Sequence, residues 1–116
     1  MKVASRQVDG TIVVDLSGRI TLGESTAEIR DTVKELADKG HKHIVLNLAQ
    51  VSYIDNAGFD ELVSTATDLR KQGGELKLLN LSDRVRDKLQ ITKLYTTFDV
   101  LDNEAKAVVS FTPKAA

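Results

Sequence analysis

Residues 43–48 read His-Ile-Val-Leu-Asn-Leu, a nearly continuous apolar run. A strand with one face in water alternates apolar and polar side chains, whereas a continuous run is typical of a strand covered on both faces in a parallel sheet. The run therefore predicts a central strand of an α/β domain. Because parallel strands need crossover connections, the segments before and after it should be helices.

Two amphipathic segments supply those helices. Before the run, Ser25-x-x-Glu28 has the pattern of a capping box, apolar residues follow at helical spacing, and Gly40 is a stop signal. After the run, residues 59–69 carry an apolar stripe with charged residues off it, and Gly73-Gly74 ends the pattern. The sequence thus predicts one helix before the central strand and one after it.

The rest of the chain supplies shorter elements. Asp9-Gly10 is favoured in two-residue turns, so residues 3–8 and 11–16 should form an antiparallel hairpin. After the second helix we expect a strand at 76–79, a short helix capped by Ser82, a weak strand at 98–101, and a last helix starting at Asp102 or Asn103.

Together these elements predict the α/β class. We expect a single domain over residues 1–111, with a mixed sheet of roughly four to five strands, an opening β-hairpin and about four helices. Residues 112–116 follow the last helix and contain the only proline, so they should form a C-terminal tail. A chain of 116 residues is long enough to bury one core.

Composition disfavours several kinds of function. Lys and Arg number 16 against 17 Asp and Glu, so a net charge of −1 provides no field that attracts nucleic acid. The chain has no cysteine, which removes disulfides and thiolate chemistry and fits a reducing compartment. No stretch approaches the roughly 20 apolar residues that span a bilayer. We therefore expect a cytoplasmic protein without direct membrane insertion and without a nucleic-acid partner.

The predicted topology brings three loops to one edge of the sheet. If the strands are parallel, the loops 18–25, 49–57 and 80–82 that follow them all leave from their carboxyl ends. In open α/β sheets ligands and partners bind at this edge, and the helix N-termini there favour anionic groups. We expect the functional site at this edge.

In the middle of that edge lies Asp55-Asn56-Ala57-Gly58. Asp55 or Asn56 can cap the second helix, and Ala57 and Gly58 permit a tight turn from strand to helix. A receiver-type phosphoacceptor at Asp55 would also need an acidic pair after the first strand and a late lysine, which are missing at the matching positions. No nucleophile, base or metal-ligand set converges elsewhere, so we predict no enzyme, cofactor or metal site.

The string HIVLNLAQVSYIDNAGFDELV resembles the signature of STAS domains, the family of bacterial anti-sigma-factor antagonists, in which an apolar strand precedes Asp-Ser-[Ser/Thr/Ala]-Gly-Leu. Leu16-Ser17-Gly18-Arg19-Ile20 is similar to the family's Leu-x-Gly-x-Leu/Ile segment, and Gly73-Gly74-Glu75-Leu76 to its turn into the next strand. The resemblance implies a single-domain regulator. Such a regulator binds an anti-sigma factor, a serine protein kinase of the histidine-kinase-like ATPase type, and frees the sigma factor when unphosphorylated.

The chain departs from the family at the phosphoacceptor. In phosphorylated members the accepting serine directly follows the motif Asp, and Asn56 occupies that place. An amide cannot be phosphorylated, and Ala57 has no hydroxyl. We hypothesise that the switch is absent or locked in the binding-competent setting, because Asn has roughly the size and capping ability of unphosphorylated serine. Relatives often carry an Asp that contacts the kinase near the sequence position of Thr21, so the resemblance leaves partner specificity open. The hydroxyls of Thr21 and Ser25 are either alternative phosphorylation sites or helix-capping groups.

Resemblance and loop topology together predict a partner-binding surface. It comprises Thr21, Asp55, Asn56, Ala57, Gly58, Asp60, Glu61 and Ser64. Within it Asp55 should brace the loop and Gly58 permit close approach, while Phe59 should be buried beneath it. The resemblance also leaves two alternatives open: an accessory subunit of a lipid-transport ATPase, and a non-phosphorylated scaffold of a signalling complex. Either a monomer or a dimer is compatible with the sequence.

Overall fold

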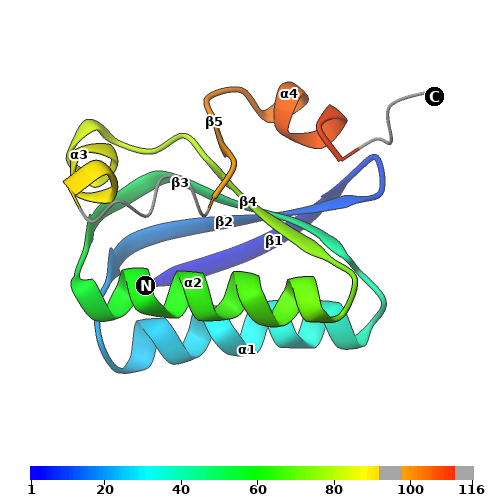
Figure 1. Ribbon diagram of the computed structural model, residues 1–116, viewed down its shortest axis with the longest axis horizontal. Helices are drawn as coiled ribbons and strands as arrows, with labels where there is room; N and C mark the ends of the chain where they lie inside the picture. Colours follow the sequence, from blue (N-terminus) through cyan, green and yellow to red (C-terminus); the bar gives the residue numbers. More distant parts are fainter. Residues whose placement is uncertain (92–97, 112–116) are drawn as a thin grey trace.

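A computed structural model describes residues 1–91 and 98–111, and these residues form a five-stranded sheet with helices, as the sequence predicts (Figure 1). The predicted tail at 112–116 lies outside the described residues. In chain order the elements are β1 (Lys2–Val8), β2 (Thr11–Ile20), α1 (Glu24–Asp38), β3 (His43–Ile54), α2 (Asn56–Lys71), β4 (Glu75–Leu79), α3 (Asp83–Ile91), β5 (Val100–Leu101) and α4 (Glu104–Val109).

The strand order in the sheet is β1-β2-β3-β4-β5. β1 is antiparallel to β2, and the other neighbouring pairs are parallel. β3 is therefore the central strand, as predicted, and Ile44, Val45 and Leu46 within it are fully buried. The hairpin turns at Asp9 and Gly10, whose φ angles of 47° and 82° are the positive values that a two-residue turn requires.

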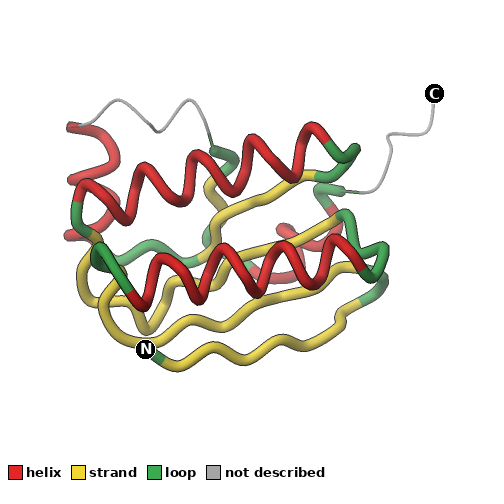
Figure 2. The backbone as a smooth tube through the Cα atoms, turned by 90° about the horizontal axis from the view of Figure 1, so that it is seen from below, coloured by secondary structure: helices red, strands yellow, loops and turns green. Residues whose placement is uncertain are grey.

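Helices cover the two faces of the sheet unequally. α1 and α2 lie side by side against one face, and the main core fills the space between them and the strands (Figures 1 and 2). On the opposite face α4 covers a smaller apolar cluster, which consists of Val13, Val45, Leu79, Ala107 and Phe111. Most of the burial that stabilises the domain is therefore on the α1 and α2 side.

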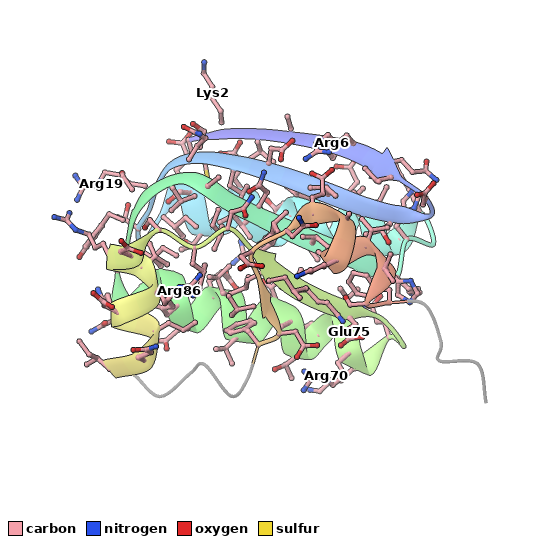
Figure 3. The ribbon with its side chains drawn as sticks, turned by 90° about the horizontal axis from the view of Figure 1, so that it is seen from above. Lys2, Arg6, Arg19, Arg70, Glu75 and Arg86 are labelled. Atoms are coloured by element: carbon pink, nitrogen blue, oxygen red, sulfur yellow. The ribbon has the colours of Figure 1, made fainter. Side chains whose placement is uncertain are left out.

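A row of polar side chains crosses the face of the sheet that α4 partly covers, from β1 to the residue after β4. Arg6 Nε and Asn47 Nδ2 each donate to a carboxylate oxygen of Asp15 at 2.7 Å, and Asn80 Nδ2 donates to Asn47 Oδ1 at 3.3 Å. Arg6, which is labelled in Figure 3, also forms an ion pair with Glu104 of α4. The Arg6 guanidinium lowers the pKa of Asp15 through its hydrogen bond. The row links β1, β2 and β3 to the residue that follows β4, and it docks the start of α4.

β2 and β3 run further than predicted. β3 continues to Ile54 because Val51 and Ile54 pair with residues of β2 and bury their side chains. Residues 49 and 50 are exposed and lie where the register between β3 and β2 shifts. Because these two exposed residues follow the apolar run, the sequence pattern predicts that the strand ends at residue 48. The predicted loops 18–25 and 49–57 are therefore wrong: the connections shorten to residues 21–23 and to Asp55 alone. The 80–82 loop is confirmed.

The starts of three helices agree with the sequence. Asp55, Ser82 and Asn103 each accept a hydrogen bond from a backbone N–H in the first turn of α2, α3 and α4 respectively. The strand predicted at 98–101 is shorter, since β5 contains only Val100–Leu101, although Phe98 is buried.

The predicted capping box at Ser25-x-x-Glu28 is wrong. Helix α1 begins after Gly23, whose N–H donates to Thr26 Oγ1 at 3.2 Å. Ser25 lies inside the first turn of α1. Its hydroxyl forms hydrogen bonds with the N–H and the carbonyl of Thr21 instead of capping a helical N–H.

Candidate partner-binding surface

The N-termini of α1, α2 and α3 gather at the carboxyl edge of the sheet, as the topology predicts (Figure 1). Residues 21–23 lead into α1, Asp55 leads into α2, and residues 80–82 lead into α3. The shortness of these connections places the starts of three helices close to the ends of β2, β3 and β4. This edge is where the predicted surface lies.

Asp55 joins two of these connections. Its Oδ1 accepts a hydrogen bond from the Gly58 N–H at 2.7 Å and so caps α2. Its Oδ2 accepts one from the Leu22 N–H at 3.0 Å, in the connection between β2 and α1. The Asp55 N–H donates to the Ile20 carbonyl at 3.1 Å. One side chain therefore holds the start of α2 and the loop before α1 in a fixed relation, which is the bracing role predicted for it.

The surroundings of Asp55 keep it ionised. The hydrogen bond from the Leu22 N–H lowers its pKa, and the Gly58 N–H and the charge of Lys88 act in the same direction. A carboxylate held in this way is an acceptor of hydrogen bonds and a poor proton donor at neutral pH. The geometry gives Asp55 a structural task in the loop.

The connection at residues 21–23 is fixed at each of its backbone N–H groups. The Thr21 N–H donates to Ser25 Oγ at 2.9 Å, the Leu22 N–H to Asp55, and the Gly23 N–H to Thr26 Oγ1 at 3.2 Å. The Ser25 hydroxyl also donates to the Thr21 carbonyl at 2.8 Å. The loop is ordered by side-chain acceptors, and the Leu22 side chain points outward with 78% of its surface exposed.

The residues after Asp55 divide into exposed and buried. Asn56 is exposed and Ala57 partly exposed, whereas Gly58 and Phe59 are buried. A Cβ on Gly58 would lie 2.7 Å from the Ile20 carbonyl oxygen, so this position permits the close approach expected of it. The predicted burial of Phe59 is confirmed. Asn56 is the first residue of α2, where its side chain faces solvent.

A shallow hollow of about 360 Å³ lies between the N-terminal parts of α1 and α2. Arg30 Nη1 and Glu61 Oε1 pair across it at 3.3 Å. The hollow is lined by Leu22, Thr26, Arg30, Ala57, Asp60, Glu61 and Ser64. The structure thus brings four predicted residues of α2 together in one hollow. It places Thr21 and Asp55 in the adjoining connections and Asn56 and Gly58 in the first turn of α2.

Three residues of the hollow, Leu22, Thr26 and Arg30, are absent from the predicted surface. The sequence carries a weak signal for the first, since Leu22 is an apolar residue between a strand and the glycine that precedes a helix. No pattern marks Arg30, because its pairing with Glu61 depends on how α1 packs against α2.

Two basic side chains lie on the other flank of the Asp55 connection. The Arg19 guanidinium carbon is 4.9 Å and Lys88 Nζ 5.0 Å from the centroid of the Tyr53 ring. Lys88 Nζ also donates to the Ile54 carbonyl at 2.9 Å, which ties α3 to the end of β3. Arg19 projects from the end of the molecule at which α3 lies (Figure 3). Arg19 and Lys88 therefore lie beside the Tyr53 ring, outside the hollow that Asp60 and Glu61 line.

A family model described as the STAS domain matches residues 2–107. The chain belongs to this family. The STAS domain is 35% identical over 107 residues to the anti-sigma-B factor antagonist of Bacillus subtilis, with 92% of this chain and 94% of that protein covered. It is 31% identical to BtrV of Bordetella bronchiseptica, with 96% and 95% covered. The predicted family is confirmed.

The fold of the STAS domain is confirmed independently by solved structures. The crystal structure of TM1081 from Thermotoga maritima superimposes with a TM-score of 0.86, covering 96% of this chain and 95% of that one, at 20% sequence identity. That likeness concerns the fold alone. Among residues 1–91 and 98–111, no helix is long and apolar enough to cross a membrane.

Proposed function

We propose that this STAS domain is an anti-sigma-factor antagonist, a non-enzymatic regulator that binds a serine-kinase anti-sigma factor of the histidine-kinase-like ATPase type and releases a sigma factor. The observation that carries the proposal is the braced edge around Asp55, which presents Asn56 and Ala57 beside a hollow on an otherwise ordinary α/β domain. The name and full-length similarity of the Bacillus subtilis relative support it. The regulator acts in the cytoplasm, where sigma factors work.

The second part of the proposal is that the phosphorylation switch is absent or locked. Asn56 is exposed at the first position of α2 and offers no hydroxyl. By the resemblance to the STAS signature, it stands where phosphorylated members carry the accepting serine. Ala57 offers none either. The Ser25 hydroxyl is engaged by the Thr21 backbone both as donor and as acceptor. A neutral Asn keeps the loop in the unphosphorylated charge state, because it lacks the charge of about −1.5 to −2 that a phosphoserine carries.

The proposal is tested by incubating the chain and its Asn56→Ser variant with each histidine-kinase-like anti-sigma factor kinase of the source organism and ATP. Binding is measured by calorimetry and phosphorylation by intact mass with peptide mapping. We expect at least one kinase to bind both forms and to phosphorylate only the serine form. Phosphate on Thr21 of the unsubstituted chain would overturn the locked switch while leaving the antagonist role.

The antagonist role itself has a separate test. The tagged chain is used to capture proteins from a lysate of the source organism, and the captured proteins are identified by mass spectrometry. Recovery of an anti-sigma factor kinase is the expected result. Recovery of the ATPase of a membrane transporter, or of other STAS proteins in a large complex, with no kinase bound would overturn the role in favour of a structural subunit.

A further inference from the structure

Leu22 has an apolar side chain that is largely exposed to water, which the hydrophobic effect disfavours. It is one of four large hydrophobic side chains that the described residues leave exposed, with 78% of its surface in water; the others are Met1, Ile91 and Val109. Met1 begins the chain, and Ile91 and Val109 are the last residues of α3 and α4. Leu22 differs from them because it lines the hollow beside the exposed start of α2.

The backbone that carries Leu22 is held in place before any partner arrives. Asp55 accepts its N–H at 3.0 Å, and the neighbouring N–H groups of Thr21 and Gly23 bind hydroxyls of α1 at 2.9 and 3.2 Å. A side chain on an ordered loop loses less conformational entropy on binding than one on a mobile loop. The loop therefore presents an apolar group in a fixed position, at little further cost in entropy.

The groups around Leu22 have the arrangement of an interface centre and its rim. The small side chain of Ala57 and the methyl-bearing Thr26 line the hollow with it, and the polar groups lie further along α1 and α2. Arg30 and Glu61 neutralise each other in an ion pair. Asp60 is exposed, and no ion pair engages it within the described part of the chain, so the hollow carries about one net negative charge.

We propose that Leu22 is the apolar anchor of the partner-binding surface, and that the partner is a protein with an apolar pocket for Leu22 flanked by a basic side chain that faces Asp60. The inference rests on the proposed function, since it takes the anti-sigma factor kinase as that partner. It adds a residue that determines affinity and the chemistry that the kinase must present. Asp55 contributes through Leu22 as a positioning residue, because it fixes the loop that carries the anchor.

The test compares Leu22→Ala, Leu22→Met and the control Val109→Ala for binding to the kinase that the unsubstituted chain binds, by calorimetry. Removing a buried anchor should raise the Kd about 10- to 100-fold. Leu22→Met, which keeps the apolar volume, should stay within about threefold. Val109→Ala, on α4, should leave the Kd within about twofold. Because Leu22 is exposed in the free chain, its alanine variant should melt at the temperature of the unsubstituted chain.

The possible outcomes distinguish a failure of the Leu22 anchor role from a failure of the proposed antagonist function. If the unsubstituted chain binds a kinase and Leu22→Ala binds as tightly, the anchor role is overturned while the proposed function stands. If Val109→Ala weakens binding as much as Leu22→Ala, the anchor role is also overturned. If the unsubstituted chain binds no anti-sigma factor kinase, the proposed function is overturned together with the inference. An Asp60→Lys variant that binds as fast and as tightly as the unsubstituted chain would overturn the basic partner group.

Discussion

Replacing Asp55 by Ala removes two hydrogen bonds with different partners, and the structure allows each to be weighed. The bond from the Gly58 N–H at 2.7 Å is a helix cap, and losing such a cap costs about 1 kcal/mol. The bond from the Leu22 N–H at 3.0 Å is also accepted by a charged group, but it lies at the surface, where solvent reduces its contribution to about 1 kcal/mol. The free energy of unfolding should therefore fall by about 2 kcal/mol.

The assay is urea unfolding at pH 7 followed by circular dichroism, with thermal unfolding as a second measure. A loss of about 2 kcal/mol should lower the melting temperature by roughly 8–12 °C in a domain of this size. Asn103→Ala is the matched control, because Asn103 caps α4 through a single bond to the Lys106 N–H at 3.1 Å. That variant should lose only about 1 kcal/mol.

The difference between the two variants measures the link from Asp55 to the Leu22 loop. If Asp55→Ala costs no more than Asn103→Ala, the link contributes nothing and the account of a braced edge is refuted. Asp55→Asn gives a further check. Its amide presents an acceptor to only one of the two N–H donors, so its stability should fall between those of the unsubstituted chain and Asp55→Ala.

Three further predictions concern stability. Gly58→Ala should lose about 1–3 kcal/mol in urea unfolding because its Cβ would lie 2.7 Å from the Ile20 carbonyl oxygen, and an unchanged stability would show that α2 can shift freely. Asn56→Asp should gain about 0.3–1 kcal/mol at pH 7, because a negative charge in the first turn favours the helix, and the gain should vanish at pH 3; a loss at pH 7 would contradict the assigned position. Arg6 holds the pKa of Asp15 below its usual 3.8, so this ion pair contributes stability above about pH 4 and loses it as the pH falls through the folded-state pKa. The stability lost between pH 7 and pH 3 should therefore be smaller in Arg6→Met than in the unsubstituted chain, and an equal loss would refute the coupling.

The sequence predicts the order of elements well because each has a local signal. The apolar run at 43–48 identifies the central strand, Asp9-Gly10 identifies the hairpin, and Asp55 and Asn103 are caps by residue type. These signals depend on backbone preferences and burial, which neighbouring residues largely determine.

What the sequence does not predict depends on contacts between distant segments. β3 extends to Ile54 because β2 pairs beside it, although exposed residues 49 and 50 break the alternation. Ser25 fits the sequence pattern of a helix cap, but its hydroxyl accepts a hydrogen bond from the Thr21 N–H instead. In the same way, Leu22 gains its place in the surface from a bond to Asp55, which lies 33 residues later. The sheet edge that carries the candidate surface could be predicted from topology, and so could its α2 residues, whereas Leu22 and Arg30 could not.

The order of strands in the sheet is also their order along the chain. Each new strand therefore joins the edge that the preceding strand left open, and no later segment has to insert between strands already paired. As the chain leaves the ribosome from its N-terminus, β1 and β2 can close as a hairpin, and β3 with α1 can then add to that template before β4 is made. The loop-closure cost of each addition is that of one crossover, so assembly can proceed stepwise from the N-terminal end.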